Sequence, residues 1–175
     1  MIRIERITPN NQVALKLPNE PFALFGRLMV SRIDGKWQFH EVLFDNSKQT
    51  QTFPNEKYDL AVIEQNGFAL GAFAGKTCVG LAIFENRWNH YLYLSDLKVV
   101  AAYRRKKIAS QLMDKATKLA KENDMRGLTT IAQDNNLGAN RFYLHYGFEI
   151  GGLNTKNYQF TKQKGKADIY YYLDF

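Results

Sequence analysis

The sequence contains little of what a disulfide-bonded, metal-binding or membrane protein needs. Cys78 is the single cysteine among 175 residues, so no intramolecular disulfide can form. The three histidines, His40, His90 and His145, lie far apart without zinc-ligand spacing, and we expect no metal site. No apolar run approaches the roughly 18 residues of a membrane helix, and the N-terminus has no signal-peptide core. These absences predict a cytoplasmic protein without a membrane partner.

Proline is also scarce, with four residues, and no repeat, linker or low-complexity tract divides the chain. The length suffices for one domain with a substantial core, and 45% of the residues are hydrophobic, as in a globular protein. We therefore predict a single domain over residues 1–175. The formal net charge of +7 favours an anionic partner, although a solvated lysine-rich surface explains the same charge.

The first half of the sequence has the pattern of strands. Residues 22–31 and 37–44 are predicted to form a hairpin around the turn Asp34-Gly35. Residues 60–65 and 68–74 are predicted as strands on either side of Asn66-Gly67, and the polar residues 45–59 as a connection or short helix. Further strands are expected over residues 77–85, 91–100, 128–132, 148–153 and 167–175.

The second half adds two amphipathic helices. Apolar residues at helical spacing predict one helix from residue 108 to about 121 and another over 137–146, ended by Gly147. This order of elements predicts a mixed α/β fold with a central mixed β-sheet flanked by helices. In the strand 91–100, regular alternation would place Asp96 and Lys98 on one face together with Leu94.

Four consecutive cations, Arg104-Arg105-Lys106-Lys107, stand where that strand leads into the first helix. A helix N-terminus presents backbone N–H groups and a partial positive charge, so it binds anions. Together these features predict a phosphate-bearing ligand. A nucleic-acid surface would need a broad basic face with exposed stacking aromatics, and the sequence has one dense cluster, so we expect no nucleic-acid partner.

Two separated segments resemble motifs of the GCN5-related N-acetyltransferases. Arg104-Arg105-Lys106-Lys107-Ile108-Ala109 resembles the (Q/R)-x-x-G-x-(G/A) signature of that family. The segment 136–148, which runs from Asn136 through Tyr143 to Gly147-Phe148, resembles its N-x-x-A-x-x-x-Y…G-F helix. Shorter stretches such as Arg87-Trp88-Asn89-His90-Tyr91 and Gln133-Asp134-Asn135-Asn136 resemble the streptothricin acetyltransferase branch.

The resemblance implies the acyl-CoA N-acyltransferase fold and a bacterial enzyme that transfers acetyl from acetyl-CoA directly to a primary amine. A small molecule such as a streptothricin-like antibiotic is the leading acceptor, which would make the protein an antibiotic-resistance enzyme. A polyamine or a protein amine is an alternative acceptor, and a non-catalytic acyl-CoA-binding module is an alternative function. Members of this family often form homodimers. The aromatic run Tyr170-Tyr171-Tyr172 could serve a dimer or complete the sheet.

The resemblance also assigns residues to the cofactor. Main-chain groups of Leu97 and Val99 would pair with the pantetheine arm, and Asn136 would contact the same arm. Asn136 is also suited to capping a helix, and the two roles are compatible. Tyr143 would protonate the coenzyme A thiolate. The full set of cofactor-binding residues implied is Leu97, Val99, Arg104, Arg105, Lys106, Lys107, Ile108, Ala109 and Asn136.

The acceptor side is predicted from carboxylates and aromatics. Asp96 is a candidate general base that would take a proton from the acceptor ammonium, directly or through water. A structural carboxylate paired with Lys98 or an arginine explains Asp96 equally well. Glu85 and Trp88 are candidate acceptor-binding residues, because carboxylates and aromatic faces attract ammonium groups.

Lys107 departs from the family signature, which has glycine at this place. Glycine lets a phosphate approach the backbone without a Cβ and adopts positive φ at little cost. A lysine suits this position if its φ is helical and its side chain points outward. A positive φ at Lys107 would instead predict a weakened or displaced cofactor.

Overall fold

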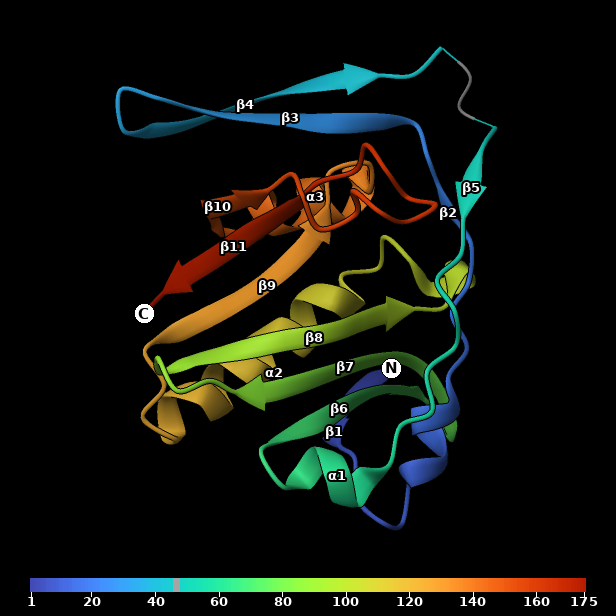
Figure 1. Ribbon diagram of the computed structural model, residues 1–175. Helices are drawn as coiled ribbons and strands as arrows, with labels where there is room; N and C mark the ends of the chain where they lie inside the picture. Colours follow the sequence, from blue (N-terminus) through green and yellow to red (C-terminus); the bar gives the residue numbers. More distant parts are fainter. Residues whose placement is uncertain (46–47) are drawn as a thin grey trace. The chain divides into compact units, whose positions relative to one another are not determined.

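The computed structural model describes residues 1–45 and 48–175, and Asn46 and Ser47 of the predicted 45–59 connection lie outside the described residues. The chain forms two compact units, which are described separately (Figure 1). Unit 1 contains Met1–Glu20, Phe53–Leu128 and Asp174–Phe175, and unit 2 contains Pro21–Thr52 and Thr129–Leu173.

Four antiparallel strands form the framework of unit 1, in the order β1-β6-β7-β8. Their bounds are β1 Ile2–Arg6, β6 Gly67–Ala74, β7 Thr77–Asn86 and β8 Tyr91–Val99. The predicted strands over 68–74, 77–85 and 91–100 are therefore confirmed. Pairing of β6 with β7 and of β7 with β8 is each interrupted by one register shift.

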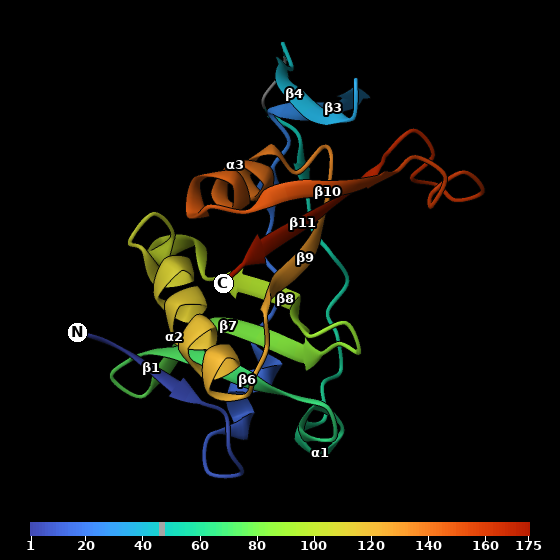
Figure 2. The ribbon, with the colours of Figure 1, turned by 90° about the vertical axis from the view of Figure 1, so that its left-hand side faces the viewer.

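Helix α2 (Ile108–Glu122) covers one face of these strands, and its buried residues include Ile108, Leu112 and Ala116. Gly80 on β7 permits the close approach, because a Cβ there would lie 3.1 Å from Cγ2 of Ile108 and 3.4 Å from Cδ1 of Leu112. Figure 2 shows α2 on one side of the strands and α1 (Leu60–Glu64) on the other. The predicted helix from residue 108 is confirmed.

The other face of the strands is covered by α1 and the 3-10 helix η1 (Gln12–Lys16). The strand predicted over 60–65 is wrong, because these residues form α1. The Asp59 carboxylate accepts a hydrogen bond from the Ala61 amide at 2.8 Å and caps the helix. Leu60 and Ile63 then reach this core with helical spacing, which a run this short does not distinguish from a strand.

Unit 2 contains most of β9 (Gly127–Gln133), most of β11 (Asp168–Asp174) and all of β10 (Glu149–Asn154), in that order. Helix α3 (Leu137–Tyr146) ends at Gly147, whose φ of 114° permits the left-handed cap that ends the predicted helix. Tyr171 is fully buried on β11 and pairs with Ile150 on β10, so the aromatic run completes this sheet.

A separate hairpin in unit 2 consists of β3 (Gly26–Ile33) and β4 (Lys36–Leu43). Its turn residues Asp34 and Gly35 have φ of 49° and 75°, as a type I′ turn requires, so the predicted hairpin is confirmed. The short strands β2 (Phe22–Ala23) and β5 (Thr50–Gln51) pair with each other. Since strands pack against helices in both units, the predicted α/β class is confirmed.

Candidate active site

A β-bulge in β8 determines where the acceptor-side residues lie. Across the pair of strands, Ile83 lies opposite Asp96 and Phe84 lies opposite Leu94, so Ser95 is an additional residue. The Ser95 hydroxyl donates to the Ile83 carbonyl at 3.2 Å. Because side chains alternate between the two faces of a regular strand, one additional residue reverses the alternation beyond it.

The bulge moves Asp96 and Lys98 to the face of β8 that carries Tyr93. Tyr93 lies opposite Glu85, and Asp96 opposite Ile83 two residues away on β7, so all four share one face. The predicted placement of Asp96 and Lys98 beside Leu94 is wrong, since it assumed unbroken alternation.

Leu97 and Val99 lie opposite Ala82 and Gly80, on the face that α2 covers. The amide of the next residue, Val100, donates to the Val79 carbonyl at 3.0 Å. Since successive residues point their main-chain groups to opposite edges of a strand, those of Val99 and Leu97 point away from β7. This orientation supports the predicted main-chain contacts of Leu97 and Val99 with a ligand.

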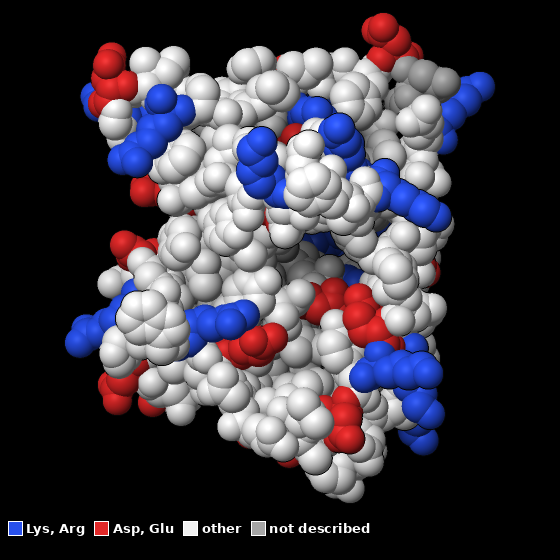
Figure 3. All heavy atoms as spheres, in the orientation of Figure 1, with Lys and Arg blue, Asp and Glu red and all other residues white. Residues whose placement is uncertain are grey.

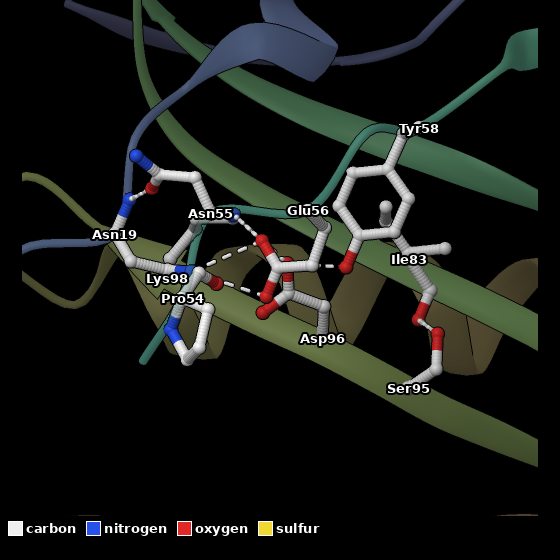
Figure 4. Close-up of polar contacts among 9 residues, drawn as sticks. All are labelled: Asn19, Pro54, Asn55, Glu56, Tyr58, Ile83, Ser95, Asp96 and Lys98. Carbon is white, nitrogen blue, oxygen red and sulfur yellow. Dashed lines mark hydrogen bonds and ion pairs between the residues drawn. The ribbon is translucent and has the colours of Figure 1, made fainter. Parts of the chain in front are cut away.

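The face shared with Tyr93 carries a polar group that we call the acidic cluster: Glu56, Tyr58, Asp96 and Lys98 (Figure 4). The Tyr58 hydroxyl donates to Oδ2 of Asp96 at 2.9 Å, and the Lys98 ammonium lies 3.1 Å from the same oxygen. The ammonium also lies 2.9 Å from Oε2 of Glu56. Asn19 donates to the Pro54 carbonyl at 2.8 Å and to the Glu56 carboxylate, which fixes the segment that carries Glu56 and Tyr58.

Burial and charge act in opposite directions within the acidic cluster. Burial raises the pKa of Asp96 above its ordinary value, and Lys98 and Tyr58 offset only part of that shift. Burial opposes ionisation of Glu56 too, yet hydrogen bonds from Lys98 and Asn19 hold the pKa of Glu56 below its ordinary value. Burial, with the charges of Asp96 and Glu56, raises the pKa of Tyr58, which therefore remains a proton donor. The pairing of Asp96 with Lys98 is the one expected of a structural carboxylate, and the base role of Asp96 remains a prediction.

Glu85 and Tyr93 already hold a cation of the chain itself. The Arg87 guanidinium lies 3.2 Å from Oε2 of Glu85 and 4.3 Å from the centroid of the Tyr93 ring. Trp88 occupies the turn between β7 and β8 and is 92% exposed. Figure 3 shows this face of unit 1, where acidic side chains gather over β8. The predicted acceptor roles of Glu85 and Trp88 therefore require that an acceptor compete with Arg87 or bind beside it.

The cationic loop, residues 104–107, follows the short 3-10 helix η2 (Ala101–Tyr103) and leads into α2. The Arg104 guanidinium donates to the Val99 carbonyl at 2.9 Å and lies 3.5 Å from the Glu20 carboxylate. Lys106 lies 5.0 Å from the centroid of the Tyr103 ring. These contacts hold positive charge beside the start of α2.

Lys107 is the N-cap of α2 and adopts left-handed φ and ψ of 59° and 17°. The helical φ under which a lysine suits this position is therefore not observed, and weakened binding of the cofactor, expected for a positive φ, stays a prediction. The left-handed conformation costs a residue with a Cβ about 1–2 kcal/mol. Arg105 has the same φ of 59°. The first turn of α2 contains no acidic residue, and the Lys107 side chain does not cap it. Amides of the first turn and the neighbouring guanidinium groups together fit a phosphate.

The remaining predicted residues, Asn136 and Tyr143, lie in unit 2. Oδ1 of Asn136 accepts from the Ala139 amide at 3.2 Å and caps α3, which confirms the capping role. Tyr143 lies on α3 and is 7% exposed. Its ring centroid is 5.6 Å from that of Phe148 and 5.5 Å from that of Tyr171. The contact of Asn136 with a ligand and the acid role of Tyr143 remain predictions.

Sequence reasoning missed Glu56 and Tyr58. Tyr58 is 38 positions from Asp96 in the sequence and belongs to a connection that was predicted only as polar. Its one available signal is the spacing of Glu56 and Tyr58, two positions apart after Pro54. In the described part of the chain, no helix is long and apolar enough to cross a membrane, and no three His, Cys, Asp or Glu side chains are grouped to hold a metal ion.

Comparison with known proteins identifies the family. Residues 36–148, well over half of the chain, match the acetyltransferase (GNAT) family. The chain belongs to the GNAT acetyltransferase family. It is an N-acetyltransferase, and its cofactor is acetyl-CoA.

Three relatives of this GNAT acetyltransferase can be aligned with nearly all of its length. Streptothricin acetyltransferase A of Bacillus subtilis (strain 168) is 31% identical over 173 residues, which cover 98% of this chain and 99% of the relative. The crystal structure of a Bacillus anthracis str. Ames protein in complex with acetyl coenzyme A has a TM-score of 0.88 at 23% identity and covers 100% of both chains. That of nourseothricin acetyltransferase has a TM-score of 0.82 at 22% identity, with 99% and 98% of the two chains covered. These two structures have the same fold as this chain.

Proposed function

We propose that this acetyltransferase acetylates a primary amine of a streptothricin-like antibiotic and thereby confers resistance. The observation that carries the proposal is the 31% identity to streptothricin acetyltransferase A over 98% of the chain. The acidic cluster supports a cationic acceptor. A net charge of +7 repels a cation at long range, and the carboxylates of Glu56, Glu85 and Asp96 offset that repulsion on one face of unit 1.

Acetyl-CoA supplies an acetyl group activated as a thioester. The amides of Ile108 and Ala109 at the start of α2, with Arg104 and Arg105, would hold its pyrophosphate. The side chains of Lys106 and Lys107 would add positive charge beside these groups. Main-chain groups of Leu97 and Val99 would pair with the pantetheine arm in the manner of an added strand.

Two side chains would move protons. Asp96 would take a proton from the acceptor ammonium and leave a neutral amine with a free electron pair. Tyr143 would donate a proton to the leaving sulfur, and Asn136, which caps α3 three residues before Ala139, would orient the ligand beside it. Trp88 would add an aromatic face to the acceptor side.

We further propose that residues 1–175 act as one catalytic domain of a bacterial cytoplasmic enzyme. The match over residues 36–148 includes segments of both compact units, which supports a single domain. Acetyl-CoA is a cytoplasmic metabolite, which supports that location. A homodimer is the expected assembly for this family, and gel filtration with light scattering tests it.

Coenzyme A release measures the reaction directly. We expect rapid release with streptothricin and slower release with aminoglycosides, polyamines and lysine peptides at equal concentration. Faster release with a polyamine or a peptide than with streptothricin would contradict the proposed acceptor. Binding of acetyl-CoA without release for any amine would indicate a non-catalytic module.

Tyr143→Phe tests the acid role in the same assay. Loss of a positioned proton donor lowers kcat by about 10²–10⁴-fold, and the KM for acetyl-CoA should stay within about twofold. Tyr146→Phe, on the same helix, is the matched control and should keep kcat near the wild-type value. An unchanged kcat in Tyr143→Phe would assign the acid role to another group.

A further inference from the structure

We propose that Tyr58 is a positioning residue for acetyl transfer, acting through its hydrogen bond to Oδ2 of Asp96 so that Oδ1 receives the acceptor's proton. The inference rests on the proposed function, and it extends the site to a segment that carries no family motif. Its basis is that the contacts of Asp96 within the acidic cluster fall on one of its two carboxylate oxygens.

Both partners of Asp96 use the same oxygen. The Tyr58 hydroxyl at 2.9 Å and the Lys98 ammonium at 3.1 Å contact Oδ2. Neither of these contacts involves Oδ1, and Asp96 keeps 14% of its side chain exposed. Oδ1 is therefore the oxygen with capacity to accept a further proton.

Lys98 alone would not fix this arrangement, because its ammonium is shared. It lies closer to Glu56, at 2.9 Å, than to Asp96, and 5.5 Å from the centroid of the Tyr58 ring. Tyr58 contributes one directed hydroxyl to Asp96, and its ring is anchored against the core that includes Leu60 and Ile83. A side chain fixed in this way holds the carboxylate plane in one orientation.

The surrounding charges keep Tyr58 in the donor role. Glu56 and Asp96 within the cluster, and Glu85 on β7, act together with burial to raise the pKa of the phenol. Tyr58 therefore does not become the base itself. The charged and titratable groups that act on Asp96 are Lys98 on β8 and Glu56 and Tyr58 on the 53–58 segment. Glu85 on β7 acts on Tyr58.

The step assigned to Asp96 balances. One proton of the acceptor R–NH3⁺ moves to Oδ1, and the electron pair of the resulting amine forms a bond to the acetyl carbonyl carbon. The carbon–sulfur bond breaks and its electron pair leaves with sulfur. The nitrogen loses a second proton, sulfur gains one, and Asp96 returns its proton to solvent.

Tyr58→Phe removes only the hydroxyl and keeps the ring. We expect kcat/KM for the acceptor to fall by about tenfold or more, and the KM for acetyl-CoA to stay within about twofold. Because the lost hydrogen bond favours the carboxylate form, the acidic limb of the pH profile of kcat/KM should move up by about half a pH unit. Altered packing alone would lower activity without moving that limb.

Tyr158→Phe is the matched control. Its hydroxyl donates to an aspartate oxygen, Oδ1 of Asp168, at 2.7 Å in unit 2, so the same chemical change is made outside the cluster. The acidic limb should not move in this variant. A shift equal to that of Tyr58→Phe would overturn the inference.

A double-mutant cycle with Asp96→Asn tests whether Tyr58 acts through Asp96. If it does, Tyr58→Phe has less than a twofold further effect on kcat/KM in the Asp96→Asn enzyme. Independent effects that multiply would overturn the positioning role, even if both variants are less stable. A wild-type enzyme that acetylates no amine overturns the proposed function and the role of Tyr58 together. A wild-type enzyme that acetylates streptothricin, with an unshifted pH limb in Tyr58→Phe, overturns this inference alone.

Discussion

The cationic loop and the acidic cluster carry opposite charge, and unit 1 builds them in different ways. The loop consists of consecutive, exposed residues, and its conformation lies in the backbone, with φ of 59° at both Arg105 and Lys107. The cluster joins residues up to 42 positions apart through short side-chain contacts, and a bulge supplies its geometry. An anion site can be encoded by one continuous segment, because its backbone amides and cationic side chains each attract the anion and their attractions add. A proton-accepting site needs particular atoms at particular distances.

The double variant Arg104→Ala/Arg105→Ala tests whether the two regions act separately. If the start of α2 holds the pyrophosphate as proposed, loss of two cations beside it should raise the KM for acetyl-CoA by about tenfold or more, with the KM for the acceptor within about twofold. Lys162→Ala/Lys164→Ala removes the same charge from an exposed loop of unit 2 and should leave both KM values unchanged. Equal increases in the two KM values would contradict the phosphate role.

Asp96→Asn separates the energetic cost of the cluster from its chemistry. Burial raises the pKa of Asp96 in the folded state above its unfolded value, so the folded state holds this proton more tightly. The resulting stability is fully present below the unfolded pKa and is lost as the pH rises through the folded pKa. Melting temperatures of both proteins from about pH 3 to pH 7 should therefore show the wild type losing stability relative to Asp96→Asn. A difference independent of pH would contradict the raised pKa.

Lys107→Gly should have the smallest effect, and it should raise the stability of the protein. Glycine relieves the left-handed conformation, and its greater freedom in the unfolded chain offsets part of the gain. We expect stabilisation of about 0.5 kcal/mol, which corresponds to a rise of about 1–2 °C in Tm. The KM for acetyl-CoA should fall or stay unchanged. Lys106→Gly, at a position without positive φ, should instead destabilise, and the same sign in both variants would exclude backbone strain at Lys107 as the cause.

Most of the fold could be predicted from the sequence, because periodicity and turn residues act locally. The hairpin at Asp34-Gly35, the two long helices and the strands of the second half all follow from such signals. Helix α1 could not be predicted, since five apolar and acidic residues after Asp59 satisfy a strand as well as a helix. Its type is decided by the core that it covers.

The same distinction between local sequence signals and contacts made only in the fold applies to the candidate site. The cationic loop, Asn136 and Tyr143 could be found because each motif lies in one continuous segment. The acidic cluster could not, because Tyr58 meets Asp96 only through the fold and because alternation predicts the wrong face for Asp96. A bulge leaves no mark in the sequence when both faces of a strand are largely apolar.

The bulge at Ser95 also affects how this chain is compared with other sequences. A relative whose strand lacks the additional residue has to be aligned with a one-residue gap at Ser95. A gap opened two positions later would equate Asp96 with a residue that points to the other face. The alignment column that contains Asp96 therefore depends on where the additional serine is placed, and the structure supplies that position.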